Sequence, residues 1–327
     1  MNIRIFSASI AAYVVTVFAP LLIGQQPEPV RVFVLAGQSN MEGQAVVDLK
    51  GKDYNDGKGT LSALRKRDGY ENRIAHLFNA NGEGNPRDDV WVRYQRENAP
   101  LLLGPLNFGF SVYGDSHHFG PELQFGHVVG DAVDAPVLIV KTAWGGKSLY
   151  RDFRPPSSGG ETGKYYSLMI SQIREAIANY ATEIPELKGR DYRLAGFVWY
   201  HGWNDGVDPA KAIPEYETNL VNLISDLRME LKQPELPVVI GELTGPWRNA
   251  PPEWEKLRKA QASAAINEKL GNFVGFVSTR DFVRPAEESP NPTHGHHEFG
   301  NAETYFLVGE ALGKEMVRLL KMPRHEE

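Results

Sequence analysis

The sequence VFVLAGQSNMEG, residues 32–43, changes character in the middle. Its first half is a run of apolar residues, most of them β-forming, and this run ends at Gly37. Such a run followed by glycine is typical of a buried strand that ends in a turn. Gln38, Ser39 and Asn40 follow at once, so three polar side chains are expected at the tip of this strand.

Further segments repeat the apolar run or show a helical pattern. The runs that are almost continuously apolar are Val32–Leu35, Val137–Lys141, Leu194–Trp199, Pro237–Glu242 and Phe273–Ser278. Strands buried on both faces have this pattern, so a parallel sheet covered by helices is expected. Apolar residues at three- and four-residue spacing indicate helices over Glu215–Lys232, Pro252–Asn267 and Asn301–Lys321. The alternation predicts an α/β fold with a doubly wound, mostly parallel sheet of five strands.

Residues 46–119 fit this alternation less well. The segment DLKGKDYNDGKGT, residues 48–60, is polar and rich in glycine, which predicts a surface loop. Residues 88–114 contain two β-like pieces, which predict an antiparallel insertion into the main pattern. The segment FRPPSSGGETG, residues 153–163, predicts another loop.

Composition excludes several classes of function. The chain of 327 residues is 42% hydrophobic and 23% charged, as is ordinary for a soluble globular protein. Its formal net charge is −6 and it has no block of like charges, which argues against nucleic acid as the main partner. Because it contains no cysteine, disulfides, thiolate metal sites and a cysteine nucleophile are excluded.

The N-terminal 24 residues, MNIRIFSASIAAYVVTVFAPLLIG, have one cation, Arg4, followed by an uncharged apolar run. This pattern predicts a signal peptide over residues 1–24, and hence a secreted or periplasmic protein. The run approaches membrane-spanning length, so an uncleaved anchor is the alternative. If the signal is cleaved, no stable membrane association is expected. Residues 25–30 are interpreted as a linker and residues 31–327 as a single domain.

In open parallel α/β sheets, ligands bind beyond the carboxyl ends of the strands. The segments that follow the five predicted strands are polar or rich in glycine: residues 37–40, 144–148, 201–205, 242–245, and the stretch from residue 280 to the histidines at 294–297. A serine, two glycine-rich turns, an asparagine and a histidine cluster are therefore expected to converge on one edge of the sheet.

Ser39 is the candidate nucleophile. A serine hydroxyl becomes reactive when a neighbouring base accepts its proton and when donors stabilise the resulting oxyanion. The alternative is that Ser39 caps the following helix, a position that serine favours.

Asn204 and the Gly145–Gly146 pair are the candidate oxyanion donors. The side-chain amide of Asn204 is a good donor in a dry site, although Asn-Asp-Gly is also a strong turn signal. A backbone N–H of Gly145 or Gly146 is the second candidate, and a tight strand-to-helix turn is the alternative reading of two glycines.

Three histidines, His294, His296 and His297, precede the last predicted helix. A metal site is not favoured, because no further ligand has a matching spacing. One of them acting as the general base for Ser39 fits better. Exposed loop residues are the alternative.

At these residues the chain resembles the SGNH hydrolase superfamily, and within it the branch of sialate O-acetylesterases and acetylxylan esterases similar to carbohydrate esterase family 6. Four blocks of that branch occur in order: Gly37–Gly43 for G-Q-S-N-M-x-G, KTAWGGKSL for the glycine turn, Gly202–Asp205 for G-x-N-D, and a histidine before the last helix. The resemblance covers Val30 to the end. It implies a flavodoxin-like three-layer α/β/α sandwich, the SGNH hydrolase fold.

The resemblance also implies roles for individual residues. Ser39 is the nucleophile and gives its backbone N–H to the oxyanion hole, together with Gly146, or Gly145, and the side chain of Asn204. His297 is the base, since it leads directly into the last helix.

The acid behind His297 departs from the family's pattern. The usual aspartate slot, three residues before the histidine, holds His294, and the glutamate slot of some relatives holds Trp203. Asp281 is the first candidate for the acid, and Asp205, Glu298 and His294 remain open beside it. A Ser–His dyad assisted by a carbonyl group is a further alternative.

The implied activity is the removal of O-acetyl groups from carbohydrates through an acetyl-enzyme on Ser39, without metal or organic cofactor. Gln38 and Trp203 are expected to contact the acetylated carbohydrate. Trp144, Trp247 and Tyr150 lie in the same loops, where sugar stacking and core packing are both open. The alternatives are a non-catalytic carbohydrate-binding protein on this fold, or a lipase or thioesterase of the same superfamily.

Overall fold

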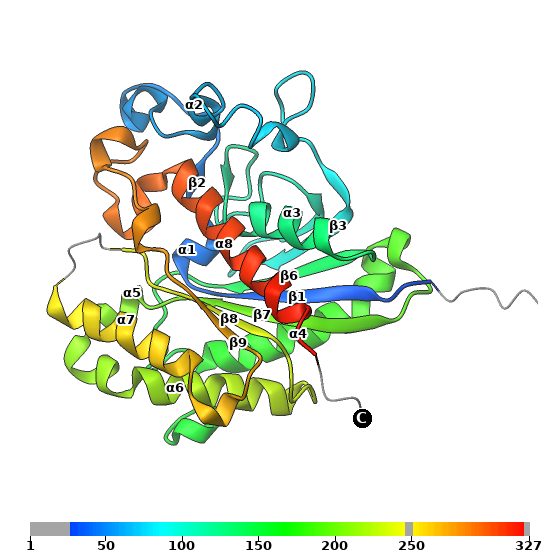
Figure 1. The fold of residues 1–327 in the computed structure, drawn as a ribbon, viewed down its shortest axis with the longest axis vertical. Helices are drawn as coiled ribbons and strands as arrows, with labels where there is room; N and C mark the ends of the chain where they lie inside the picture. Colours follow the sequence, from blue (N-terminus) through cyan, green and yellow to red (C-terminus); the bar gives the residue numbers. More distant parts are fainter. Residues whose placement is uncertain (1–26, 246–250, 324–327) are drawn as a thin grey trace, which may run out of the picture.

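The computed structural model describes residues 27–245 and 251–323, and its centre is a seven-stranded sheet (Figure 1). The strand order is β4-β3-β6-β1-β7-β8-β9. These strands are β1 (Val30–Gly37), β3 (Arg87–Gln95), β4 (Leu101–Leu106), β6 (Val137–Ala143), β7 (Tyr192–Tyr200), β8 (Val238–Gly241) and β9 (Val274–Val277). All neighbours are parallel except β3 and β4.

The predicted α/β fold with a mostly parallel sheet is confirmed, but the prediction of five strands is wrong. The five apolar runs are β1, β6, β7, β8 and β9, and their order β6-β1-β7-β8-β9 is that of flavodoxin. The predicted antiparallel insertion is the β3–β4 hairpin, which extends the main sheet because β3 pairs in parallel with β6. Charged residues such as Arg93, whose partner Glu183 lies on a distant helix, interrupt the apolar pattern of β3.

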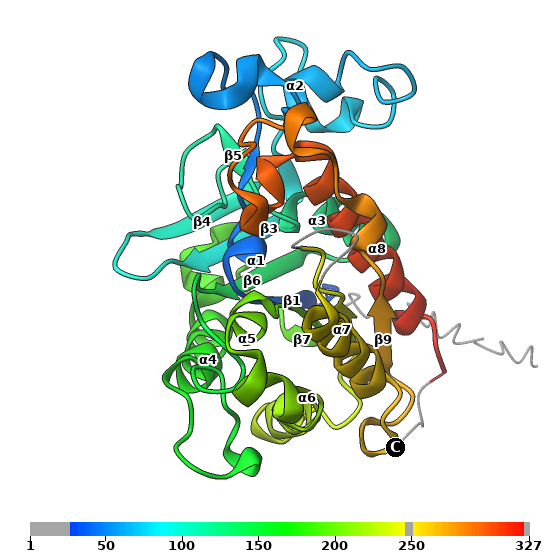
Figure 2. The ribbon, with the colours of Figure 1, turned by 90° about the vertical axis from the view of Figure 1, so that its left-hand side faces the viewer.

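Helices cover both faces of the sheet, which gives three layers (Figures 1 and 2). One face packs against α4 (Lys164–Glu183), α6 (Pro209–Glu230) and α7 (Pro252–Ala265), and the other against α3 (Glu122–Ala132) and α8 (Ala302–Leu320). The predicted helices 215–232, 252–267 and 301–321 correspond to α6, α7 and α8. The sequence patterns had not indicated α3 or α4.

Short elements connect these layers. They are α1 (Ser39–Glu42), β2 (Ala45–Val46), α2 (Leu61–Leu64), β5 (His118–Phe119) and α5 (Trp203–Val207), with 3₁₀ turns at Lys52–Gly57, Ala75–Leu77, Pro156–Ser158, Pro185–Leu187, Glu268–Leu270, Arg280–Phe282, Ala286–Glu288 and Gly295–Gly300. The predicted surface loop at residues 48–60 lies beside the loop that precedes α8 (Figure 2). Asn55 Nδ2 joins the two by donating to the carbonyl oxygens of Glu287 at 3.0 Å and Ser289 at 2.9 Å.

The predicted signal peptide, residues 1–24, lies outside the described residues, and so do residues 25 and 26 of the predicted linker. β1 begins at Val30, so the last residue of the predicted linker belongs to the sheet. Among the helices of the described residues, none combines the length and the apolar character needed to cross a bilayer.

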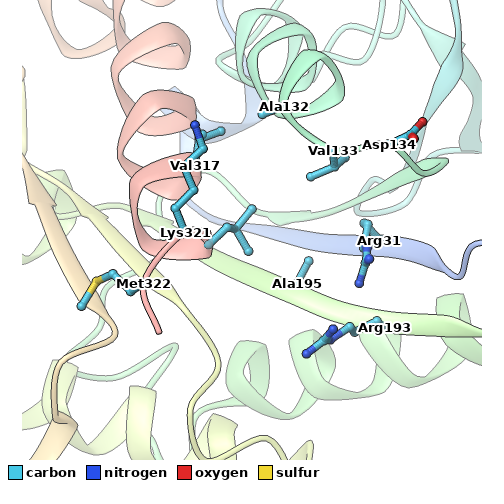
Figure 3. A pocket seen from close by; sticks show the side chains of 10 residues that line it. Arg31, Ala132, Val133, Asp134, Arg193, Ala195, Val317, Lys321 and Met322 are labelled. Carbon is cyan, nitrogen blue, oxygen red and sulfur yellow. The ribbon is translucent and has the colours of Figure 1, made fainter. Parts of the chain in front are cut away.

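A cavity of about 430 Å³ lies at the amino ends of β1 and β7 (Figure 3). Its lining includes Arg31 and Arg193 at the starts of these strands and Lys321 at the end of α8. Ser39 follows the opposite, carboxyl end of β1. This cavity is therefore separate from the predicted site.

Candidate active site

Ser39 lies where β1 ends and α1 begins. The turn requires glycine at position 37, because a Cβ atom there would be 2.1 Å from the Tyr200 carbonyl oxygen and 2.9 Å from the Met41 Cβ. Gln38, not Ser39, occupies the N-cap of α1, and it makes no side-chain capping bond. The interpretation of Ser39 as a helix cap is therefore wrong. Ser39 as a whole residue is 9% exposed, at the carboxyl edge of the sheet.

Asn204 is held beside this turn by Gln38. Gln38 Oε1 accepts the Gly202 N–H at 3.0 Å, and Gln38 Nε2 donates to Asn204 Oδ1 at 3.2 Å. Because the Asn204 oxygen is engaged, its amide hydrogens face away from Gln38. Those hydrogens have no partner among the described residues. The predicted oxyanion donor is thus bonded to the residue next to Ser39, and its side-chain N–H groups are unbonded within residues 27–245 and 251–323.

Gln38 itself is 2% exposed, and both of its polar atoms are bonded within the protein. The structure gives it the position of a residue that orients Asn204. Contact between Gln38 and substrate stays a prediction.

The glycine turn after β6 is the second wall of the site. A Cβ atom on Gly145 would lie 3.5 Å from the Ser39 Cβ and 2.9 Å from a Glu42 carboxylate oxygen, so Gly145 touches the nucleophile's helix. Gly146 follows with φ +72°, a left-handed conformation that favours glycine, and it is exposed. Both candidate backbone donors therefore lie at the edge that carries Ser39.

Asp205 and His201 hold the loop that continues from this turn. The fully buried carboxylate of Asp205 accepts the backbone N–H groups of Leu149 at 2.8 Å and Tyr150 at 2.9 Å. Burial raises the pKa of Asp205 to about 7. His201 Nε2 faces the Lys147 carbonyl oxygen at 2.9 Å and so donates to it, and burial lowers the pKa of His201 to about 4.

His297 belongs to the 3₁₀ turn Gly295–Gly300, which precedes α8. Its ring centre is 4.0 Å from that of His296 and 6.5 Å from that of His294. Burial, and then the charges of these two histidines, lower the pKa of His297 to about 3. The half-buried imidazole is therefore neutral at physiological pH, as a general base must be.

Asn40 and Tyr305 connect the Ser39 helix to the His297 turn. Asn40 Nδ2 donates to Glu298 Oε1 at 3.1 Å, and the Tyr305 hydroxyl donates to Asn40 Oδ1 at 2.7 Å. The same hydroxyl lies 3.3 Å from the His297 carbonyl oxygen. These bonds bring together the two segments that carry the predicted nucleophile and base. The sequence motif contains Asn40, but no sequence pattern indicated its partners, which are Tyr305 on α8 and Glu298 in the turn before α8.

The acid behind His297 is not assigned by these contacts. In the described part of the chain, no carboxylate is hydrogen-bonded to the His297 ring. Asp281 is exposed in the turn at residues 280–282, and His294 is also exposed. Glu298 is buried, with Oε1 accepting from Asn40 and from the Gly245 N–H at 3.0 Å. Burial raises the pKa of Glu298 to about 8, so this carboxyl is largely protonated at neutral pH.

Aromatic side chains flank the site. Trp203 is half-buried, with its ring centre 4.8 Å from that of Trp254 and 5.9 Å from that of His296. Trp144 is only 1% exposed and packs against Tyr165, so it is a core residue and not a sugar platform. Tyr150 is half-buried, and Trp247 lies outside the described residues.

Tyr113 was missed by the sequence interpretation. It is 51% exposed, and its hydroxyl donates to Gln44 Oε1 at 2.8 Å, two residues beyond α1.

Within residues 27–245 and 251–323, no three metal-ligating side chains lie close enough together to hold a metal ion.

Five strands in flavodoxin order, with a serine after β1, an asparagine after β7 and a histidine before α8, form the arrangement expected of an SGNH-type esterase. The chain matches the family described as carbohydrate esterase, sialic acid-specific acetylesterase, over residues 29–306, and it belongs to that family. It is therefore a carboxylic ester hydrolase of the carbohydrate esterases.

Solved structures with low sequence identity share the fold. A protein from Arabidopsis thaliana is 17% identical with a TM-score of 0.56, and the match covers 89% of this chain and 98% of that one. NanS is 14% identical with a TM-score of 0.52, covering 90% and 97%. A carbohydrate acetylesterase from Xanthomonas citri is 15% identical with a TM-score of 0.50, covering 87% of this chain and 56% of that one. No curated protein sequence matches.

Proposed function

We propose that the protein hydrolyses O-acetyl esters of carbohydrates through an acetyl-enzyme formed on Ser39. The observation that carries the proposal is the hydrogen bond from Gln38, the residue next to Ser39, to the Asn204 side-chain oxygen, which leaves the Asn204 side-chain N–H groups without a partner among the described residues. A non-catalytic binding protein has no need of an oriented amide donor next to a serine. Family membership supports an acetylated carbohydrate, such as an acetylated sialic acid, as the substrate.

The first chemical step forms the acetyl-enzyme. Ser39 Oγ attacks the acetyl carbonyl carbon while His297 accepts the hydroxyl proton. The tetrahedral oxyanion is stabilised by the backbone N–H groups of Ser39 and Gly146 and by the Asn204 amide. His297 then gives its proton to the departing sugar oxygen.

The second step repeats this chemistry with water. Water attacks the acetyl-enzyme, His297 accepts its proton, and the same three donors stabilise the second oxyanion. Acetate leaves, and Ser39 regains its hydrogen. The depressed pKa of His297 keeps the imidazole neutral and ready to accept a proton in both steps. A half-buried imidazole with no carboxylate partner among the described residues fits the Ser–His dyad alternative.

The experiment that tests this proposal measures acetate release by the Ser39→Ala variant. Wild type and variant are assayed on p-nitrophenyl acetate, on O-acetylated sialic acid and on acetylated xylan. Ser39→Ala is expected to lose all hydrolysis with an unchanged circular dichroism spectrum. Ser225→Ala is the matched control, because the Ser225 hydroxyl donates to the Val221 carbonyl oxygen within α6. Hydrolysis that persists in Ser39→Ala refutes the acetyl-enzyme, and sugar binding without hydrolysis by the wild type favours a binding protein.

We propose further that the protein is exported, with residues 1–24 as its signal peptide. The support is the sequence pattern of one cation followed by an apolar run. N-terminal sequencing of the protein recovered from its native host tests this, since cleavage after the apolar run is expected. Recovery of the intact N-terminus in a membrane fraction would indicate the anchor instead.

A further inference from the structure

A lysine is buried in the sheet next to the helix that carries Ser39. Lys141, on β6, is fully buried, which is costly for an ammonium group unless each hydrogen finds a partner. All three hydrogens do. Nζ donates to the carbonyl oxygens of Glu42 at 2.8 Å and Phe110 at 2.6 Å, and to a carboxylate oxygen of Glu122 at 2.7 Å.

The helix that Lys141 touches cannot fix its own position. α1 has four residues, and its single turn closes with the Gly43 N–H on the Ser39 carbonyl oxygen at 3.1 Å. Helices this short are unstable without tertiary contacts. The last carbonyl groups of a helix also lack partners within it. Lys141 supplies that partner at Glu42, the C-terminal residue of α1.

A second contact holds the same end of α1. Gly43 has φ +97°, and a Cβ atom there would lie 2.6 Å from the backbone of Gly120. The Gly120 N–H donates to Glu122 Oε1 at 2.9 Å, while the other oxygen of Glu122 receives Lys141. Glu122 therefore ties together the lysine and the backbone that abuts the end of α1.

The Glu42 side chain extends this arrangement to the glycine turn. Its Oε1 accepts the Tyr94 hydroxyl at 3.2 Å, and its Oε2 lies 2.9 Å from where a Gly145 Cβ would be. One residue thus has its carbonyl oxygen on Lys141 and its carboxylate against the turn that carries the candidate oxyanion donors. A shift of Glu42 would move Ser39 and that turn relative to each other.

We propose that Lys141, paired with Glu122, is a positioning residue of the esterase: it fixes the C-terminal end of α1 and so sets Ser39 against the turn at Gly145. The inference rests on the proposed function. Lys141 is too buried to meet substrate, so it acts through Glu42. Misplacement of a reacting group by about 1 Å costs on the order of 100-fold in rate. The loss is expected in kcat, because the groups that would bind sugar are unchanged.

The test removes both buried charges together. Lys141→Met with Glu122→Gln removes the lysine together with the carboxylate that it hydrogen-bonds, and the glutamine keeps an acceptor for the Gly120 N–H. We expect a folded protein whose kcat on p-nitrophenyl acetate falls roughly tenfold to 100-fold, with KM within about twofold of wild type. The burst of p-nitrophenol should slow by the same factor, because acylation is the step that uses Ser39.

A matched control removes another ion pair that contains a buried cation. Arg93→Met with Glu183→Gln eliminates a pair on β3 and α4, where Arg93 is 2% exposed and bonds Glu183 at 2.7 Å. This control should lower the melting temperature and leave kcat unchanged.

Rescue gives an independent measurement. The chain has no cysteine, so Lys141→Cys introduces a unique thiol. Alkylation with bromoethylamine in denaturant, followed by refolding, rebuilds an ammonium of nearly the same length and should restore kcat per folded molecule. The proposal is overturned if the double variant and the thiol form both keep kcat per folded molecule within about threefold of wild type while Ser39→Ala is inactive. Activity in Ser39→Ala would overturn the proposed function itself.

Discussion

Gln38→Glu is expected to abolish most of the activity by turning the Asn204 amide around. Gln38 Nε2 donates to Asn204 Oδ1 at 3.2 Å, and Gln38 Oε1 accepts the Gly202 N–H at 3.0 Å. A carboxylate retains the second contact and loses the first, because it has no hydrogen to donate. The Asn204 amide then rotates its NH₂ group toward the carboxylate and presents its oxygen to the oxyanion.

The size of this loss follows from the role of the donor. Removal of one oxyanion donor lowers kcat by about 10²–10³-fold, which corresponds to about 2.7–4 kcal/mol. Asn204→Ala should show this loss directly, and Gln38→Glu should approach it. In the double variant, Gln38→Glu has no amide left to misdirect. The two effects should therefore not multiply, and the double variant should match Asn204→Ala within about threefold.

The assay is steady-state hydrolysis of p-nitrophenyl acetate above neutral pH, where the introduced carboxyl is ionised. KM is expected to stay unchanged, because the donor acts on charge that develops in the transition state. Gln172→Glu is the matched control, since Gln172 is a 5% exposed glutamine on α4 that donates to the Gln95 carbonyl oxygen. Multiplicative losses in the double variant, or a loss below about threefold for Gln38→Glu, would refute the reasoning.

Two pH dependences follow from the other site residues. Burial and the neighbouring histidines lower the pKa of His297 to about 3, so kcat/KM should stay level down to about pH 4. A fall of kcat/KM near pH 6.5 would contradict this, and would show that a carboxylate partner keeps the pKa of His297 at its ordinary value. Burial raises the pKa of Glu298 to about 8, so its contribution to stability is fully present below pH 4.5 and is lost as pH rises through 8. Glu298→Gln keeps the acceptor without the charge. In urea unfolding, the variant should be as stable as wild type at acid pH and more stable than wild type at alkaline pH by on the order of 5 kcal/mol. A variant and a wild type of equal stability at alkaline pH would contradict this.

The sheet was predictable where strands are buried on both faces. β1, β6, β7, β8 and β9 appear in the sequence as continuous apolar runs for that reason. β3 and β4 were recognised only as β-like pieces. Arg93 on β3 is buried and pairs with Glu183 on α4. A local sequence pattern does not predict that a charged residue is buried when its partner lies 90 positions away.

Tryptophans show a second limit of local patterns. Trp144 and Trp203 both follow a strand and both were candidates for sugar contact. In the structure Trp144 packs into the core against Tyr165, whereas Trp203 stays half-buried beside Trp254. Which way a side chain turns at the end of a strand depends on the helices that cover that face.

The sequence by itself determined the order in which the candidate site residues occur along the chain. A serine follows β1, a glycine turn follows β6, an asparagine follows β7, and a histidine precedes α8. Alternating strands and helices bring such residues to one edge because parallel strands share their carboxyl ends. Tertiary structure alone decided how those residues are held. Gln38 orients Asn204, Asn40 joins Ser39's helix to the histidine turn, and Lys141 binds the end of that helix. These are contacts between residues about 100 to 260 positions apart, and their geometry depends on packing that no single segment encodes.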